Sequence, residues 1–111
     1  MTARVTIEAG ICGFRTTAET SSADGQNVTF AVTSDCEKIR RLATQLAEQG
    51  PIDAYSEISP DSPSRLLGTA RATLKGCCAG CAVPTGLYKA MQVAAGLALP
   101  KDISIRIQEI G

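Results

Sequence analysis

The sequence contains no histidine and no tryptophan, and its formal net charge is zero. Without histidine there can be no Ser-His or Cys-His catalytic pair, no imidazole metal ligand and no histidine pH switch. The 11 basic residues balance 11 acidic ones, which argues against nucleic acid as the main partner because such binding needs a basic excess. These absences leave few catalytic groups, and we lean toward a protein that is not an enzyme.

Long apolar runs are also missing. The segment from Met1 to Glu8 carries charges and lacks the apolar core of a signal peptide. The longest weakly polar run, Met91 to Leu99, is too short to span a bilayer. We therefore expect a soluble, cytoplasmic protein with no membrane partner. No linker or repeat divides residues 1–111, so the chain is predicted to form a single domain with its own core.

Hydrophobic periodicity predicts an α+β fold. Residues 4–9, 14–20 and 27–32 alternate as half-buried strands do, and turn residues separate them, which indicates an antiparallel three-strand meander. A capping box at Ser34–Glu37 is expected to start a first helix. A second helix is predicted from residue 61 to 74, with Leu67 on its buried side, and a third from Pro84 to 94.

The last predicted element is a strand in which Ile103, Ile105 and Ile107 alternate with polar residues. The element order indicates a two-layer sandwich with a mainly antiparallel sheet, formed by the N-terminal meander plus this C-terminal strand, and about three helices on one face. Residues 51–63 are rich in Pro, Asp and Ser, and they either form only a turn or hold a short strand near 54–58.

The unusual chemistry is thiol chemistry, because the chain has five cysteines. In a reducing compartment, clustered cysteines more often bind metal or carry out redox reactions than form a disulfide framework. Cys78 and Cys81 form a C-x-x-C motif in a glycine-flanked loop, where both sulfurs can reach one ion. Cys12 follows the first strand and Cys36 follows the third, and both strands of an up-down-up meander end at the same edge of the sheet.

We therefore predict a metal site formed by Cys12, Cys36, Cys78 and Cys81, with Cys77 as a possible substitute ligand. Thiolates without imidazole or carboxylate suit a zinc ion or an iron–sulfur cluster. The site requires residues 51–63 to turn only, so that the second helix runs back toward Cys12 and Cys36. If residues 54–58 cross the sheet as a full strand, the two groups of cysteines lie at opposite ends.

Two alternatives stay open. Cys78 and Cys81 also fit a metal-free thiol-redox or redox-sensing protein. The chain can instead be an interaction or small-ligand module whose cysteines only pack, since free cysteine is among the most buried residue types. Lys38, Arg40 and Arg41 form a small basic group that is expected to face solvent. Nothing in the sequence indicates a protein partner or a homo-oligomer.

Four blocks resemble an uncharacterised family of small prokaryotic proteins, and together they extend over nearly the whole chain: Ile11-Cys12-Gly13-Phe14, Ser34-Asp35-Cys36-Glu37, Cys81-Ala82-Val83-Pro84 and Ala94-Ala95-Gly96-Leu97-Ala98-Leu99-Pro100. The resemblance carries no activity over to this chain. It singles out Cys12, Cys36 and Cys81 as motif positions, whereas Cys77 and Cys78 are more particular to this sequence. The resemblance thus implies a variant of the site with three thiolates and one open or external ligand.

Overall fold

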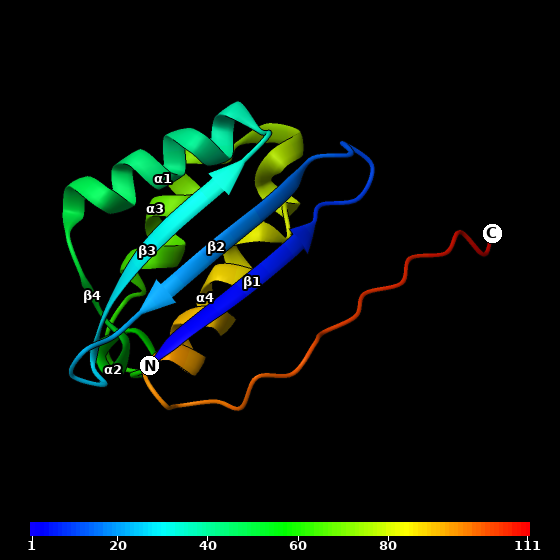
Figure 1. The fold of residues 1–111 in the computed structure, drawn as a ribbon. Coiled ribbons are helices and arrows are strands. Elements are labelled where there is room, and N and C mark those ends of the chain that lie inside the picture. Colours follow the sequence, from blue (N-terminus) through cyan, green and yellow to red (C-terminus); the bar gives the residue numbers. More distant parts are fainter.

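A computed structural model describes residues 1–111 and shows a four-stranded antiparallel sheet with helices on one face (Figure 1). The strands lie in the order β1-β2-β3-β4, with the bounds β1 Thr2–Glu8, β2 Arg15–Ser21, β3 Asn27–Ser34 and β4 Ile52–Asp53. The helices are α1 Glu37–Gln49, α2 Ala54–Glu57, α3 Arg65–Thr73, the 3-10 helix η1 Gly76–Gly80 and α4 Val83–Ala94. The predicted α+β fold and N-terminal meander are confirmed.

The meander keeps its polar face in solvent and its apolar face under the helices. On the exposed face, Arg4 pairs with Glu19 and Arg15 pairs with Glu8, so ion pairs join β1 to β2 at both ends. The turn between β2 and β3 contains Gly25 at φ 74°, a backbone conformation that glycine adopts without steric cost.

Helices α1 and α4 each bury one apolar stripe against the sheet. The stripe of α1 includes Ile39, Leu42 and Leu46, as its periodicity predicts. Helix α4 approaches β1 closely because it has no side chain at Gly86: a Cβ there would lie 2.5 Å from Cδ1 and 2.8 Å from Cγ1 of Ile7. No helix is both long and apolar enough to cross a membrane.

The alternative of a strand at 54–58 is wrong, and so are two predicted helix starts. The side chain of Asp53 accepts hydrogen bonds from the amides of Tyr55 and Ser56, which turns the chain into the short helix α2 instead. Helix α1 begins at Glu37, because Ser34 still belongs to β3 and its hydroxyl bonds the hydroxyl of Thr16 and the amide of Cys36.

Helix α3 starts later than predicted, at Arg65, with Ser64 as its capping residue. Leu66 is fully buried and Leu67 is exposed, so the prediction for Leu67 is wrong, although Ala70 and Leu74 further along the chain are buried. The reversal that precedes α3 is held by two side chains. Glu57 accepts hydrogen bonds from the hydroxyl of Ser64 and from the amides of Arg65 and Leu66.

The second of these side chains is Arg65. Its Nη2 lies 3.4, 3.3 and 3.0 Å from the carbonyl oxygens of Gln49, Gly50 and Pro51, so it satisfies carbonyl groups that the end of α1 leaves free. Residues 51–63 therefore reverse the chain, β4 spans only two residues, and α3 runs back along α1 (Figure 1).

The predicted C-terminal strand is absent. Residues 101–111 have no regular secondary structure, and Ile103, Ile105 and Ile107 are exposed. Ile52–Asp53, paired with β3, forms the fourth strand instead. An alternating pattern specifies which way side chains point once a strand is paired, but a strand also needs a neighbour, and the segment extends away from the sheet of its own chain (Figure 1).

Candidate thiolate site

All five cysteines are free, and the structure places each of them at or beside the end of an element. Cys12 lies in the loop between β1 and β2, and Cys36 is the residue that precedes α1. Cys77 and Cys78 lie within η1, and Cys81 follows η1 two residues before α4. Figure 1 shows the loop after β1, the end of β3 and η1 at the same end of the molecule.

The thiol of Cys81 lies near enough to cysteines of both groups for their charges to affect its pKa. Burial raises the pKa of the Cys81 thiol above its ordinary value of 9.0. A hydrogen bond from the Val83 amide to the sulfur opposes this rise, and the charges of the thiols of Cys12, Cys36 and Cys78 add to it. Two thiols that are distant in the sequence, those of Cys12 and Cys36, and the neighbouring thiol of Cys78 therefore act on Cys81, which is protonated at neutral pH.

The exposure of the thiols divides them into two kinds. Cys36, Cys78 and Cys81 are half-buried and pack against the hydrophobic core. Cys12 and Cys77 are exposed, and Cys77 is not among the thiols that act on Cys81. Three thiols are thus fixed on the packed part of the molecule, and Cys12 approaches them from a loop.

The loop that carries Cys12 has a glycine on each side of it in a left-handed conformation, Gly10 at φ 96° and Gly13 at φ 74°. No group of three or more cysteine, aspartate or glutamate side chains is arranged closely enough to hold a metal ion. A four-thiolate site therefore requires the sulfurs to draw closer together, and among the four predicted ligands only Cys12 is exposed.

Lys38 is a site residue that the sequence analysis missed. It is exposed, as expected, and in addition its Nζ lies 3.3 Å from the sulfur of Cys78 and donates a hydrogen bond to it. The available signal was its position in the first turn of α1, two residues after Cys36. The ammonium group brings positive charge to the thiol end of the molecule.

The helices that begin at this end have no capping side chain. Cys36 precedes α1 and Ala82 precedes α4, and neither side chain bonds the free amides of its helix. Free amides at a helix start carry partial positive charge and favour an anion such as a thiolate. One of these amides, that of Val83, donates a hydrogen bond to the sulfur of Cys81.

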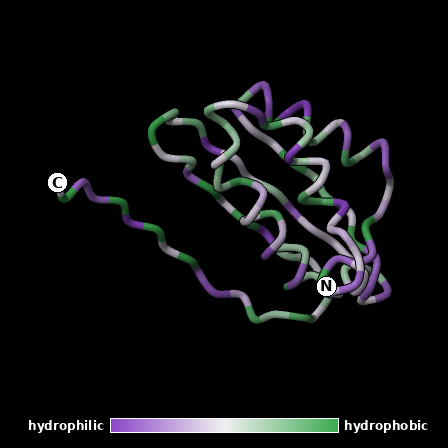
Figure 2. Tube along the Cα trace, turned by 180° about the vertical axis from the view of Figure 1, so that it is seen from behind, coloured by the Kyte–Doolittle hydropathy of each residue, from purple (hydrophilic) through white to green (hydrophobic).

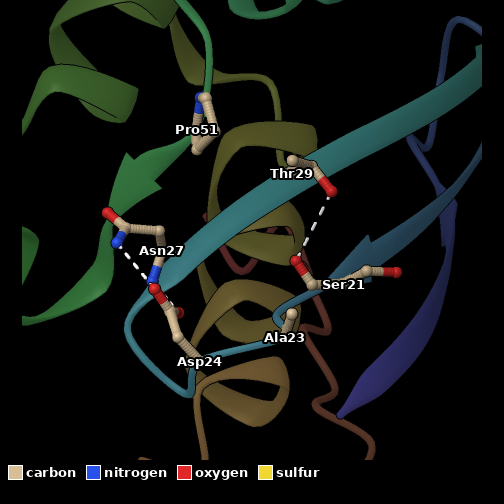
Figure 3. A pocket seen from close by; sticks show the side chains of 6 residues that line it. All are labelled: Ser21, Ala23, Asp24, Asn27, Thr29 and Pro51. Atoms are coloured by element: carbon tan, nitrogen blue, oxygen red, sulfur yellow. Dashed lines mark hydrogen bonds between the residues drawn. The ribbon is translucent and has the colours of Figure 1, made fainter.

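Two shallow hollows flank the fold. One, of about 300 Å³, lies beside Cys81 and is lined by apolar side chains from α3 and α4 together with Arg71. The other, of about 330 Å³, lies at the turn between β2 and β3, far from the cysteines (Figure 3). There Asp24 bonds Asn27, and Thr29 donates to the carbonyl of Ser21. Only the first hollow adjoins a thiol, so only that one bears on a small-ligand function.

Residues 3–107 match the model of a family of unknown function, DUF6951. The match spans all the strands, the helices and the cysteines, and it extends into the C-terminal segment. No curated protein and no solved structure matches the chain.

Proposed function

The chain belongs to the DUF6951 family of unknown function, and from its thiols we propose that it binds a zinc ion or an iron–sulfur cluster in a metal- or electron-handling or structural role. The ligands are the thiolates of Cys12, Cys36, Cys78 and Cys81, with Cys77 as the substitute. The proposal rests mainly on one observation, the influence on Cys81 of the two sequence-distant thiols of Cys12 and Cys36 together with that of Cys78.

The same observation favours a bound cation. Burial is the main cause of the raised pKa of Cys81, and repulsion between thiolates gathered at one place adds to it. A divalent ion or a cluster replaces the repulsion by attraction and holds the thiols deprotonated. Without metal, Cys81 is mostly a thiol at neutral pH and hence a weak nucleophile. The contribution of the neighbouring thiols to this pKa is the part of the observation that supports metal binding.

The surrounding groups suit the charge of such a site. Four thiolates around a divalent ion leave two negative charges, which need nearby donors and positive charge. Lys38 contacts Cys78, and the amides at the starts of α1 and α4 have no capping side chain. Cys12 completes the set when its glycine-flanked loop moves inward. In the three-thiolate variant, Cys12, Cys36 and Cys81 bind the metal and an external ligand takes the fourth position.

The test is metal analysis and a visible absorption spectrum of protein purified without oxygen. We expect one ion or cluster per chain, and a loss of at least tenfold in occupancy for Cys12→Ser, Cys36→Ser and Cys81→Ser. Cys77→Ser is the matched control and should keep its metal, because Cys77 is exposed and does not act on Cys81. Wild-type protein that holds no metal and cannot be reconstituted with zinc or with iron and sulfide overturns the proposal.

A second candidate is a redox pair of Cys78 and Cys81. The amide of Cys81 donates to the carbonyl of Cys78 at 3.1 Å, so one tight turn carries both residues. Mass-spectrometric thiol counting under a graded oxidant tests it. Reversible formation of one Cys78–Cys81 disulfide in metal-free protein supports the redox function, and five thiols that stay reduced overturn it.

A further inference from the structure

The C-terminal segment carries exposed apolar side chains along one side of an extended chain. The exposed fractions are 53 % for Ile103, 71 % for Ile105 and 90 % for Ile107, which share this side, and 95 % for Ile110, which lies on the opposite side. Figure 2 shows hydrophobic and hydrophilic residues alternating along this segment, and both views of the chain show it standing clear of its own sheet. Such a row of isoleucines is expected to be covered by a protein surface in solution.

A surface that fits this row is the outer edge of β1. β1 is the first strand of the sheet, and it pairs with β2 along its whole length on one side only. On the other side, the backbone groups of every second residue have no partner strand. Val5 and Ala3 are only half-buried at this edge, although they pack against the core. The edge therefore offers both hydrogen-bonding groups and a partly covered apolar row.

The charged residues determine the direction and register in which the C-terminal segment can pair with β1. Along β1, Arg4 and Glu8 are four residues apart, and they pair with Glu19 and Arg15 of β2. In the C-terminal segment, Asp102 and Arg106 are also four residues apart and carry the opposite charges in the same order. A parallel alignment therefore places Asp102 beside Arg4 and Arg106 beside Glu8. An antiparallel alignment reverses the order and can form only one of the two pairs.

The same alignment places the isoleucines on the correct face. With Asp102 beside Arg4, Ile103 lies beside Val5 and Ile105 beside Ile7, on the side of the sheet that the helices cover. Charged residues then alternate in sign across three strands on the exposed face, and apolar residues continue the core on the other. The family match also includes these residues, since it ends at residue 107.

The segment cannot readily take this place in its own chain. It leaves α4 beside the start of β1, so within one chain it would have to run parallel to β1 (Figure 1). In Figure 1 the helices lie behind the sheet and β1 lies to the right of β3, which makes the connection from β3 through the helices to a strand beyond β1 left-handed. Direct crossovers between parallel strands of one sheet are right-handed in about 98 % of cases, and the longer route here, which includes the two-residue strand β4, has the disfavoured hand.

We propose that residues 102–107 of one chain add as a parallel fifth strand to the β1 edge of a second copy, and that the reciprocal exchange closes a two-fold dimer. The partner copy imposes no crossover, so the handedness rule does not oppose the pairing. The proposal does not depend on the thiol site, because β1 and the C-terminal segment contain no cysteine.

The test is light scattering after size-exclusion chromatography, with reductant and chelator present so that neither disulfides nor metal can join the chains. We expect wild-type protein to be a dimer and the chain truncated after Pro100 to be a monomer. Ile105→Asp should weaken the dimer by at least about tenfold, because it places a charge among apolar side chains. Ile110→Asp is the matched control, since residue 110 lies beyond β1 in this register, and it should remain dimeric.

Amide hydrogen exchange identifies the surfaces involved. In the wild-type dimer, the outward amides of β1 and those of residues 102–107 should be protected, and the protection in β1 should fall in the truncated chain. A monomeric wild-type protein overturns the proposal, whether its C-terminal segment is protected on its own β1 or unprotected. A dimer that persists after truncation also overturns it.

Discussion

The helices that begin at the two ends of the sheet differ in whether a side chain of the preceding residue caps them. At the end that contains the turn between β2 and β3, Asp53 and Ser64 cap α2 and α3, and Glu57 binds two further amides of α3. At the thiol end, Cys36 and Ala82 leave the starts of α1 and α4 uncapped. The first end satisfies its polar groups with its own side chains, whereas the thiol end keeps donors and sulfurs available for something that the chain does not itself supply.

The largest effect is expected at the capped end. Glu57→Ala removes the acceptor of three hydrogen bonds from a buried position, and we expect a loss of about 3 kcal/mol in the free energy of unfolding. Urea titration should show a lower midpoint at an unchanged slope. At the thiol end, Cys81→Ala in metal-free protein should cost no more than about 1 kcal/mol. Equal losses at the two positions would contradict the comparison.

A pair of conservative changes at helix starts should have opposite signs. Ser64→Ala removes a cap that accepts a hydrogen bond from the Leu67 amide and should destabilise the protein by about 1 kcal/mol. Cys36→Ser supplies a capping hydroxyl where none is used and should stabilise metal-free protein by about 0.5 kcal/mol. Thermal unfolding of both variants in chelator checks this, and a loss of stability in both would show that Cys36 already satisfies the start of α1.

The two ends should also lose stability at opposite extremes of pH. Hydrogen bonds from Asn27 and Gln26 lower the pKa of Asp24, and a hydrogen bond from Gln26 lowers that of Asp53. Both carboxylates therefore stabilise the fold above the ordinary pKa of 3.8, and this stabilisation is lost as the pH falls below it. Asp24→Asn should flatten the acid limb of a stability–pH profile.

At the thiol end the sign is reversed. The raised pKa of Cys81 means that the unfolded chain releases this proton first, so stability falls as the pH rises through and above 9.0 in metal-free protein. Cys81→Ala should remove part of the alkaline limb and leave the acid limb unchanged. An alkaline limb that is identical in both proteins would show that Cys81 does not ionise differently on folding.

The smallest effect concerns Lys38. Lys38→Met keeps most of the side-chain volume and removes the charge beside Cys78. We expect metal affinity to fall about two- to threefold, the size of an exposed charge contact, with little change in unfolding. Competition with a coloured chelator measures this affinity. Arg41→Met is the matched control. It also removes one positive charge from α1, but Arg41 takes no part in the hydrogen bond between Lys38 and Cys78. Equal losses for both variants would assign the effect to net charge alone.

Local patterns in the sequence were sufficient for much of the fold. The meander and the buried faces of α1 and α4 follow from periodicity, because a period of two or of 3.6 residues acts within one element. The C-terminal segment has the same period as a true strand, yet it has no neighbour within the chain. Its case shows that periodicity identifies strands that are able to pair but does not identify the partner.

The sequence predicted which residues belong to the candidate site, but it did not determine how they are arranged in space. The positions of Cys12, Cys36 and Cys81 at element ends followed from the predicted boundaries. Their placement at one end of the molecule depends on the reversal at residues 51–63. The hydrogen bonds of Asp53, Glu57 and Arg65 hold this reversal, and those of Glu57 and Arg65 join groups 7 to 16 residues apart in the sequence, which no local pattern predicts. The contact of Lys38 with Cys78 joins residues 40 apart, and no local pattern reports such a pair.

The hydrogen bonds of Arg65 also affect how accurately the opposite end of α3 is positioned. A helix of nine residues is about 13.5 Å long at about 1.5 Å per residue. A tilt of about 10° at Arg65 would therefore displace the end of α3, from which the chain enters η1, by about 2.3 Å, which is the length of a zinc–sulfur bond. The guanidinium that holds three carbonyl oxygens at the end of α1 thus determines, from the opposite end of the molecule, how accurately η1 is positioned relative to the start of α1.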